Sequence, residues 1–223
     1  MKGYLLFLLL ASLFASSELV AEDQSAPSID AANATGKHAL SATPSGRITA
    51  PPVSEMTEDQ KALYDKESGT FSGPIGPRMP LINSAEVERA WDQLSAALAK
   101  SALPRNLREL AILTVAVTWR SEFEWYVHSP AAVRFGIDPS IVEAMRKGQE
   151  PAFTADDQRI VYRYATELQR THQVSDDAYA AAWKLLGTKT LVDLTVLIGH
   201  YTSVSMTLNA HKVPIPDGVP RAF

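Results

Sequence analysis

The sequence predicts an all-α domain of about seven helices, with one helix buried at its centre. Between residues 57 and 208, apolar residues recur at intervals of three and four, which is the repeat of one helix face. No segment shows the alternation of apolar and polar residues that marks a half-buried strand. The stretch 104–117 is apolar on nearly every side, as helices inside a domain core are.

The first 21 residues have the pattern of a secretory signal peptide. Lys2 supplies the positive charge, residues 5–15 the apolar stretch, and residues 16–21 the small side chains before a cleavage site. A membrane anchor is the alternative, but the apolar run is shorter than the roughly twenty residues that cross a bilayer. We therefore expect cleavage, export to the periplasm or the exterior, and no stable membrane span in the mature protein.

Residues 22–50 follow as a predicted tether. They are rich in Ala, Ser, Thr and Pro and contain few large apolar side chains, so they cannot bury enough surface to order themselves. The predicted helical domain then spans residues 51–216, and residues 217–223 form a short C-terminal tail.

The domain is expected to begin with a short helix opened by Thr57. Glycine and proline residues then predict a loop, without an element of its own, over residues 69–80. An amphipathic helix follows from Ser84, and its apolar residues lie at the spacing of one face that would cover the core. These residues are Val87, Trp91, Leu94 and Leu98.

Pro104 fits the first turn of the next helix, which runs through the apolar stretch and is expected to be central. After Arg120 another helix carries residues 121–128. Because proline lacks an amide donor and disfavours helical geometry in the residue before it, we expect a kink or a restart at Pro130.

Four further segments complete the predicted domain, at residues 138–147, 154–171, 175–186 and 191–208. Thr154 and Ser175 are expected N-caps, and Gly187 is expected to stop the third of these helices. The last segment is apolar enough to suggest a membrane span, but Asp193 and His200 within it favour a helix packed inside the domain.

Charge and cysteine content exclude two kinds of function. The formal net charge is −4, so nucleic acid is not an expected partner. The chain contains no cysteine, which excludes disulfides and any reaction that needs a thiolate.

Glu124 and His128 are four residues apart on a predicted helix, so their side chains share one face. A carboxylate beside an imidazole favours the protonated ring, which suits a general acid or base. Most Glu and His pairs at this spacing lie on a protein surface and have no catalytic role. Here it lies among aromatic residues, and the preceding apolar helix contains one acid, Glu109, which needs a partner if it is buried.

Three patterns accompany this pair: a Leu103-Pro104-x-x-x-x-Glu109-Leu110 start of an apolar helix, a glycine at Gly136, and a late helix that runs through Asn209 to Pro214. Together they resemble the carboxymuconolactone decarboxylase and alkylhydroperoxidase-D-like (AhpD-like) proteins. The resemblance extends from about Met56 to Pro216 and is most specific between Arg120 and Gly136. It implies an AhpD-like helical fold and self-association as a homotrimer or hexamer.

In the peroxidase-type branch of that family, a Glu precedes the His by nineteen residues, as Glu109 precedes His128, and a Cys-x-x-Cys pair lies between them. Ser121 and Glu124 stand at the two cysteine positions here, and neither side chain can carry out a thiol redox cycle. The lactone decarboxylase branch instead has a Glu four residues before the His, as Glu124 is. That branch implies a lyase, decarboxylase or isomerase acting on a small carboxylated lactone by proton transfer, with no metal or organic cofactor.

The resemblance implies a role for each candidate residue. His128 would donate or accept the proton, and Glu124 would orient and charge it. Glu109 would be either a second proton site with a raised pKa or a structural partner between helices. Four residues are candidates for binding a small-molecule substrate: Ser121, Trp125, Tyr126 and His200. The aromatic residues among them equally suit the core or a subunit interface, and His200 equally suits a core histidine.

Two alternatives remain open from the residues alone. Two carboxylates and one histidine, Glu109, Glu124 and His128, suit iron or manganese, although no second motif fixes the geometry of such a site. The second alternative is that the protein is not an enzyme. It would then be an exported module that binds a small molecule or serves in assembly, with the helical core of the family but without its thiols.

Overall fold

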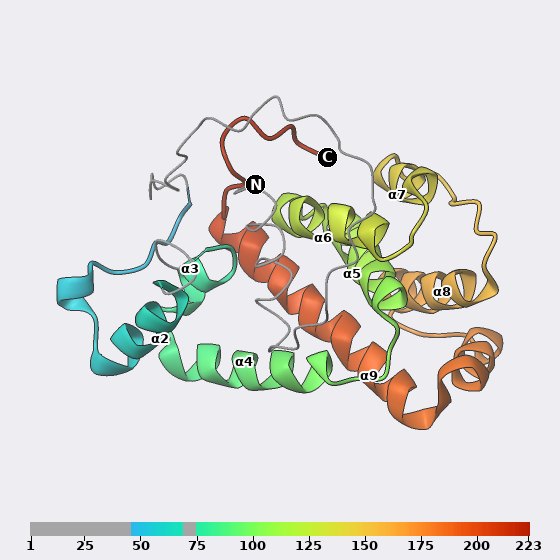
Figure 1. The fold of residues 1–223 in the computed structure, drawn as a ribbon, viewed down its shortest axis with the longest axis horizontal. Coiled ribbons are helices and arrows are strands. Elements are labelled where there is room, and N and C mark those ends of the chain that lie inside the picture. Colours follow the sequence, from blue (N-terminus) through green and yellow to red (C-terminus); the bar gives the residue numbers. More distant parts are fainter. Residues whose placement is uncertain (1–45, 69–74) are drawn as a thin grey trace, which may run out of the picture.

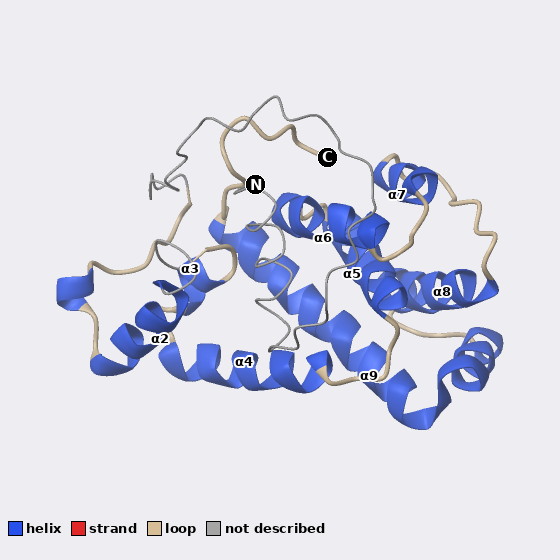
Figure 2. Cartoon of the chain, in the orientation of Figure 1, coloured by secondary structure: helices blue, strands red, loops and turns tan. Residues whose placement is uncertain are grey.

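The computed structural model describes residues 46–68 and 75–223. These residues form a 3-10 helix and eight α-helices and contain no strand, which confirms the predicted all-α fold (Figure 2). The elements are η1 Val53–Glu55, α2 Glu58–Ser68, α3 Arg78–Leu81, α4 Ala85–Ala99, α5 Arg105–Trp119, α6 Glu122–Arg134, α7 Pro139–Arg146, α8 Asp156–Thr171 and α9 Asp176–His211. The predicted signal peptide and the predicted tether up to residue 45 lie outside the described residues.

The buried central helix that the sequence predicts is α5. It packs against α6, α8 and α9, and its residues from 109 to 116 are all buried. Figure 1 shows α9 crossing the domain, with α5, α6 and α8 on one side of it and α4 on the other. A helix that is apolar on nearly every side is stable only when neighbours cover it on several sides, and these three helices do so.

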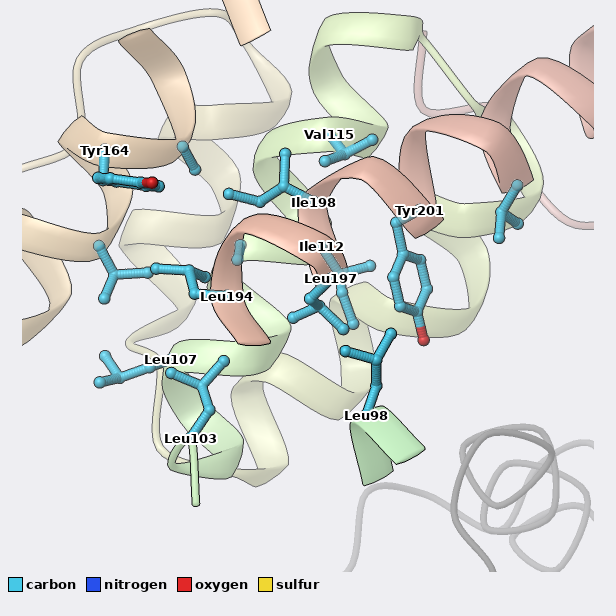
Figure 3. Close-up of a cluster of buried hydrophobic side chains, with 14 of the residues drawn as sticks. Leu98, Leu103, Leu107, Ile112, Val115, Tyr164, Leu194, Leu197, Ile198 and Tyr201 are labelled. Atoms are coloured by element: carbon cyan, nitrogen blue, oxygen red, sulfur yellow. The ribbon is translucent and has the colours of Figure 1, made fainter. Parts of the chain in front are cut away.

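The core lies where α5 and α9 cross. Leu107 and Ile112 of α5 pack with Leu194 and Ile198 of α9, and each of the four side chains is at most 1% exposed (Figure 3). Burying one such side chain contributes about 1.5 to 3 kcal/mol. Because the chain has no cysteine, its stability rests on packing of this kind rather than on cross-links.

The helix α4 buries the predicted apolar face only in part: Leu98 lies in the core as predicted. Val87 and Leu94 are exposed, at 50% and 38%, whereas Glu88 and Ser95 are buried. Both buried polar residues have partners on segments that are distant in sequence. These partners offset the cost of removing polar groups from water, and a hydrophobic pattern cannot reveal them.

The predicted loop at 69–80 ends in a helical turn, α3, which the sequence did not indicate. This turn holds Arg78, whose Nη1 donates to Glu88 Oε1 at 2.9 Å. Its Nη2 donates to Asp92, also on α4. The burial of Arg78 against two carboxylates therefore fixes the turn and explains why α4 turns a charged residue inward.

The restart expected at Pro130 does not occur, because α6 continues through it to Arg134. A proline inside a helix removes one backbone hydrogen bond and costs about 3 kcal/mol. The two alanines that follow, Ala131 and Ala132, are buried, and Ala132 belongs to a second core cluster that includes Leu110 and Trp125. Their packing holds the last turn of α6 in place despite the missing bond.

Of the helix boundaries predicted at Thr154, Ser175 and Gly187, the last two are confirmed. Ser175 is the N-cap of α9 and accepts a backbone N–H of the first turn, and Gly187 has φ 70° and ψ 170°, which breaks α9 into two helices. The prediction for Thr154 is wrong, since Ala155 precedes α8 without a side-chain cap. Asp157 inside the helix accepts a first-turn N–H instead.

Among the described residues, α9 is the one helix whose length and composition would allow it to cross a membrane, and half of its apolar window is buried inside the domain. Core helices of folded domains have the same composition. The burial of Leu194, Ile198 and Val204 against α5 and α8 agrees with the packed helix that Asp193 and His200 predicted.

Both ends of the described chain fold back onto the helices. The backbone N–H of Arg47 donates to the carbonyl of His211 at the end of α9, at 2.7 Å. The backbone N–H groups of Ala222 and Phe223 donate to the carboxylate of Glu122 at 2.8 and 3.1 Å. Part of the predicted C-terminal tail thus packs against the first turn of α6.

Candidate active site

A two-residue turn between α5 and α6 brings the predicted residues together. Arg120 ends α5 in the left-handed conformation, with φ 48°, and Ser121 is the N-cap of α6. The two helices pack side by side after this turn. As a result, Glu109 near the start of α5 meets His128 of α6, 19 positions further along the chain.

The imidazole of His128 lies between two carboxylates. Its Nδ1 is 2.7 Å from Glu109 Oε2, a short hydrogen bond, and its Nε2 is 3.7 Å from Glu124 Oε2, which is an ion-pair distance but not a hydrogen bond. All three residues are buried, with exposed fractions of 2% for His128 and Glu124 and 6% for Glu109. The orienting contact that we expected from Glu124 is therefore made by Glu109.

The two neighbours decide the charge of His128. Burial alone would lower the pKa of His128, but the charges and the hydrogen bond of Glu109, together with Glu124, outweigh it and raise the pKa above its ordinary value. Nδ1–H of the imidazolium then donates to Glu109. This raised pKa favours the imidazolium, whose second proton is on Nε2, the nitrogen that faces Glu124.

Glu124 is a carboxyl group of the site whose pKa is raised. Burial raises the pKa of Glu124 to about 7, with His128 opposing the rise and Glu109 adding to it. A carboxyl group with this pKa exchanges a proton readily at neutral pH. Glu124 is thus suited to store a proton, and Glu109 is suited to hold the ring.

Tyr201 of α9 completes the surroundings of His128, and sequence reasoning missed it. Its ring centroid is 5.2 Å from that of His128, with the rings nearly perpendicular at 88°. Tyr201 is buried at 3% exposure. The one available signal was its position directly after His200 in an apolar helix, and that does not show which side chain reaches the site.

His200, the residue before Tyr201, faces α4. Its Nε2 is 3.1 Å from Ser95 Oγ, and its ring packs edge-on against Trp91 at 4.9 Å. Burial lowers the pKa of His200 to about 4. It is therefore neutral at physiological pH, and it also contacts the ring of Tyr201.

Two buried side-chain oxygens of α6 and its N-cap have no hydrogen-bond partner within the described part of the chain. They are Ser121 Oγ and Glu124 Oε2. Ser121 is fully buried and, although it is the N-cap, its hydroxyl does not cap the helix. Buried polar atoms in folded proteins nearly always have partners. Of the two, Glu124 Oε2 lies 3.7 Å from Nε2 of His128, and the Ser121 hydroxyl is an available donor at the start of the same helix.

The aromatic candidates lie on other sides of α6. Trp125 belongs to the second core cluster and packs edge-on against Phe223 at 5.4 Å. Tyr126 packs against Phe123 at 6.2 Å, and burial raises the pKa of the Tyr126 phenol. Trp125 is therefore a core residue, which was one of the two roles that its sequence allowed. It follows Glu124 directly, and neighbouring residues of a helix point to different faces.

The geometry does not support the metal alternative. The two carboxylates contact opposite nitrogens of His128 rather than converging on one point, and within residues 46–68 and 75–223 no cluster of three potential ligands is arranged to hold an ion. A cavity of about 70 Å³ lies between α5, α7 and α8, and it is lined by residues such as Thr114 and Tyr162 rather than by the His128 site.

Comparisons with known proteins agree with this architecture. No curated protein sequence matches the chain. A solved structure, of an uncharacterized peroxidase-related protein from Ralstonia eutropha JMP134 described as an alkylhydroperoxidase AhpD core, is similar with a TM-score of 0.64 and 12% identity. The similarity covers 79% of this chain and 95% of that one, and at this identity it shows the fold alone. Residues 85–165 match the model of the carboxymuconolactone decarboxylase family. The chain thus has an AhpD-like helical fold, and its residues 85–165 are similar to the carboxymuconolactone decarboxylase family.

Proposed function

We propose that this protein is an acid–base lyase that needs no cofactor and removes the carboxyl group of a small carboxylated lactone. The observation that carries the proposal is the buried imidazole of His128, held by Glu109 on one nitrogen and facing Glu124 with the other. A charged imidazole in such a place is a ready general acid. Thiol peroxidase chemistry is excluded, since the sequence contains no cysteine.

The proposed reaction balances with one proton. The bond between the ring carbon and the carboxylate breaks, its electron pair moves into the conjugated lactone carbonyl, and carbon dioxide leaves. His128 then donates the proton on Nε2 to that carbon, so the net change is R–CO₂⁻ + H⁺ → R–H + CO₂. Glu109 keeps the imidazole oriented throughout. Glu124, whose pKa is about 7, returns a proton to the ring.

Other residues would shape the substrate site. Ser121 Oγ lies buried without a partner in the described chain and would donate to an oxygen of the lactone. Tyr201 would set the face of the imidazole that the substrate meets. His200, neutral and bound to Ser95, would support Tyr201 from behind rather than transfer a proton.

Turnover in deuterium oxide tests this proposal. We expect the purified protein to release carbon dioxide from carboxymuconolactone and to place one deuterium on the carbon that lost the carboxylate, because the imidazole proton exchanges with solvent. Gas release and mass spectrometry of the product measure the two events. A Glu143→Gln variant, changed at an exposed salt bridge of α7, serves as the matched control.

A rate equal to that of buffer across a panel of small lactones and aromatic acids would refute the decarboxylase proposal. If a small molecule nevertheless remained bound through purification without turnover, a non-catalytic binding module would be the better description. The fold would be unaffected by either result.

Self-association is the second part of the proposal, together with export directed by residues 1–21. The exposed apolar side chains of α4 and α9, such as Leu94, Val192 and Val196, would lie between copies of the chain. We expect a trimer or hexamer in sedimentation velocity runs, and a monomer after Val192→Glu with Val196→Glu. Val53→Glu, at a position exposed to 48% in η1, should leave assembly unchanged. A monomeric wild type at micromolar concentration would contradict this expectation.

A further inference from the structure

The cavity between α5, α7 and α8 is lined by none of the residues of the His128 site. Thr114 and Met145 are buried at its base, whereas Gln149, Glu150 and Arg170 are exposed at its mouth. Its volume of about 70 Å³ is roughly half that of a cavity of about 150 Å³ that accepts benzene. A ligand of a few heavy atoms therefore fits, with its polar ends toward the mouth.

The end of α7 shapes the mouth of this cavity. Gly148 has φ 68°, a left-handed conformation that favours glycine. Its N–H donates to the carbonyl of Met145 at 3.0 Å, and the N–H of Gln149 donates to that of Ala144 at 2.9 Å. These two bonds form a Schellman motif, which ends the helix. Gln149 and Glu150 therefore leave the helix and line the cavity.

Glu150 and Arg170 both line the cavity, and within the described part of the chain neither forms an ion pair. The charged residues near them in sequence are paired. Glu143 contacts two basic residues at the end of α7, and Glu167 of α8 contacts Arg163 at 2.8 Å. One anion and one cation at the same cavity are thus left for a ligand.

The hydroxyl groups of the cavity divide into acceptors on α5 and a donor on α8. Thr114 Oγ1 donates to the carbonyl of Leu110 at 2.9 Å, and Thr118 Oγ1 donates to that of Thr114 at 2.8 Å. Because their protons are used within α5, these hydroxyls offer only lone pairs to a ligand. Thr166 Oγ1, on α8, is buried and makes no hydrogen bond of ordinary geometry with the described residues, so its proton is available.

Tyr162 lies among these groups on the α8 side of the cavity. Burial and the charge of Glu150 raise the pKa of Tyr162, while the nearby hydroxyl of Thr166 and the charge of Arg170 oppose the rise. The phenol therefore keeps its proton at neutral pH and lies within electrostatic reach of both charges. Its O–H is a second donor on the α8 side.

We propose that this cavity binds a small zwitterion, an α-amino acid with a side chain no larger than a methyl group. Its ammonium group lies between Glu150 and the two α5 hydroxyls, and its carboxylate binds Arg170 and the α8 hydroxyls. A simple anion meets the carboxylate of Glu150 and the lone pairs of the α5 hydroxyls, and a simple cation meets Arg170. The site does not depend on the reaction proposed at His128.

Calorimetric titration with glycine, acetate and methylamine tests the need for both charges. Acetate has the carboxylate of glycine without the ammonium group, and methylamine is a cation at neutral pH without the carboxylate. We expect the purified protein to bind glycine roughly tenfold more tightly than either of the other two probes, because each lacks one set of charge-assisted hydrogen bonds.

Two charge-removing variants should change this preference in opposite ways. Glu150→Gln should weaken glycine and strengthen acetate, because a repelling carboxylate is gone. Arg170→Gln should weaken glycine and strengthen methylamine. We expect changes of roughly three- to tenfold, since both residues are exposed and water screens their charges. Arg163→Gln, on the same helix but paired with Glu167 outside the cavity, is the matched control and should change nothing.

Thr166→Val tests the buried hydroxyl, because valine keeps the shape of the side chain without its polar atom. We expect a higher melting temperature in buffer, since a buried hydroxyl without a normal partner destabilises the folded state. Glycine should bind several-fold more weakly. His128→Gln should bind glycine as the wild type does, because His128 is not part of the cavity.

Equal affinities of the wild type for glycine and acetate, or no binding of glycine, would overturn the inference. So would a glycine affinity that is the same in Glu150→Gln, Arg170→Gln and Thr166→Val as in the wild type. Loss of glycine binding in His128→Gln alone would place the ligand in the other site and would also refute the inference. Release of carbon dioxide from carboxymuconolactone is a separate measurement, and its failure would leave this inference intact.

Discussion

Replacing His128 with glutamine is expected to lower the rate of decarboxylation by roughly 100- to 10,000-fold, the range for loss of a general acid or base. Glutamine keeps a polar group of similar reach beside Glu109 but cannot donate a proton to carbon. The loss should fall on kcat rather than KM, because the proton moves in the transition state and not on binding. Initial rates of carbon dioxide release measure it.

The matched control is His172→Gln, which changes an exposed histidine at the end of α8 and should keep the wild-type rate. Circular dichroism melting of both variants separates lost chemistry from lost folding, since His128 is buried and bonded to Glu109. A folded His128→Gln variant with more than a tenth of the wild-type rate would show that another group supplies the proton. Glu124 would then be the first candidate, because of its raised pKa.

The sequence determined the helices well because their signals are local. Seven or eight residues of regular spacing suffice to indicate a helix, and Ser175 and Gly187 mark their ends by side-chain and backbone properties that act within one turn. The continuity of α6 through Pro130 depended instead on the burial of the turn that follows. Such tertiary packing overrides a local preference and cannot be read from spacing.

The inward face of α4 shows the same limit more clearly. Val87 and Leu94 fit the apolar stripe of a core helix, yet the structure buries Glu88 and Ser95 instead. The cause lies in partners from two distant segments, Arg78 and His200. A hydrophobic pattern predicts the buried face of a helix from the side chains of that helix alone. It cannot predict the burial of a polar residue that is stabilised by a partner on another segment.

The sequence predicted which residues form the candidate site, but not which of them would bond to one another. The spacing of four placed Glu124 near His128, and the need for a partner suggested Glu109. Which carboxylate takes the hydrogen bond depends on how α5 and α6 pack, and there Glu109 is closer by 1 Å, at 2.7 against 3.7 Å. Tyr201 reaches the site from α9, at a separation along the chain that no local pattern spans.

The pH dependence of folding provides a test of the site that needs no substrate. The pKa of Glu124 is 4.5 when the group is exposed and about 7 in the folded protein. Between these values the folded state holds a proton that the unfolded chain has lost, so the free energy of unfolding falls as pH rises. The raised pKa of His128 acts in the same direction, since its stabilising contribution is present below 6.5 and is lost as pH rises through the folded value.

We therefore expect Glu124→Gln to be more stable than the wild type at pH 8 by up to about 3 kcal/mol, the magnitude that follows from a pKa raised from 4.5 to about 7. At pH 5 the two proteins should differ little, because Glu124 is then already neutral when folded. Urea unfolding at the two pH values measures this, with Glu86→Gln, at an exposed position on α4, as the control. A variant that loses as much stability as the wild type between pH 5 and pH 8 would mean that Glu124 is ionised in the folded protein. In that case it would hold no proton for the ring, and the proton returned to His128 would have to come from solvent.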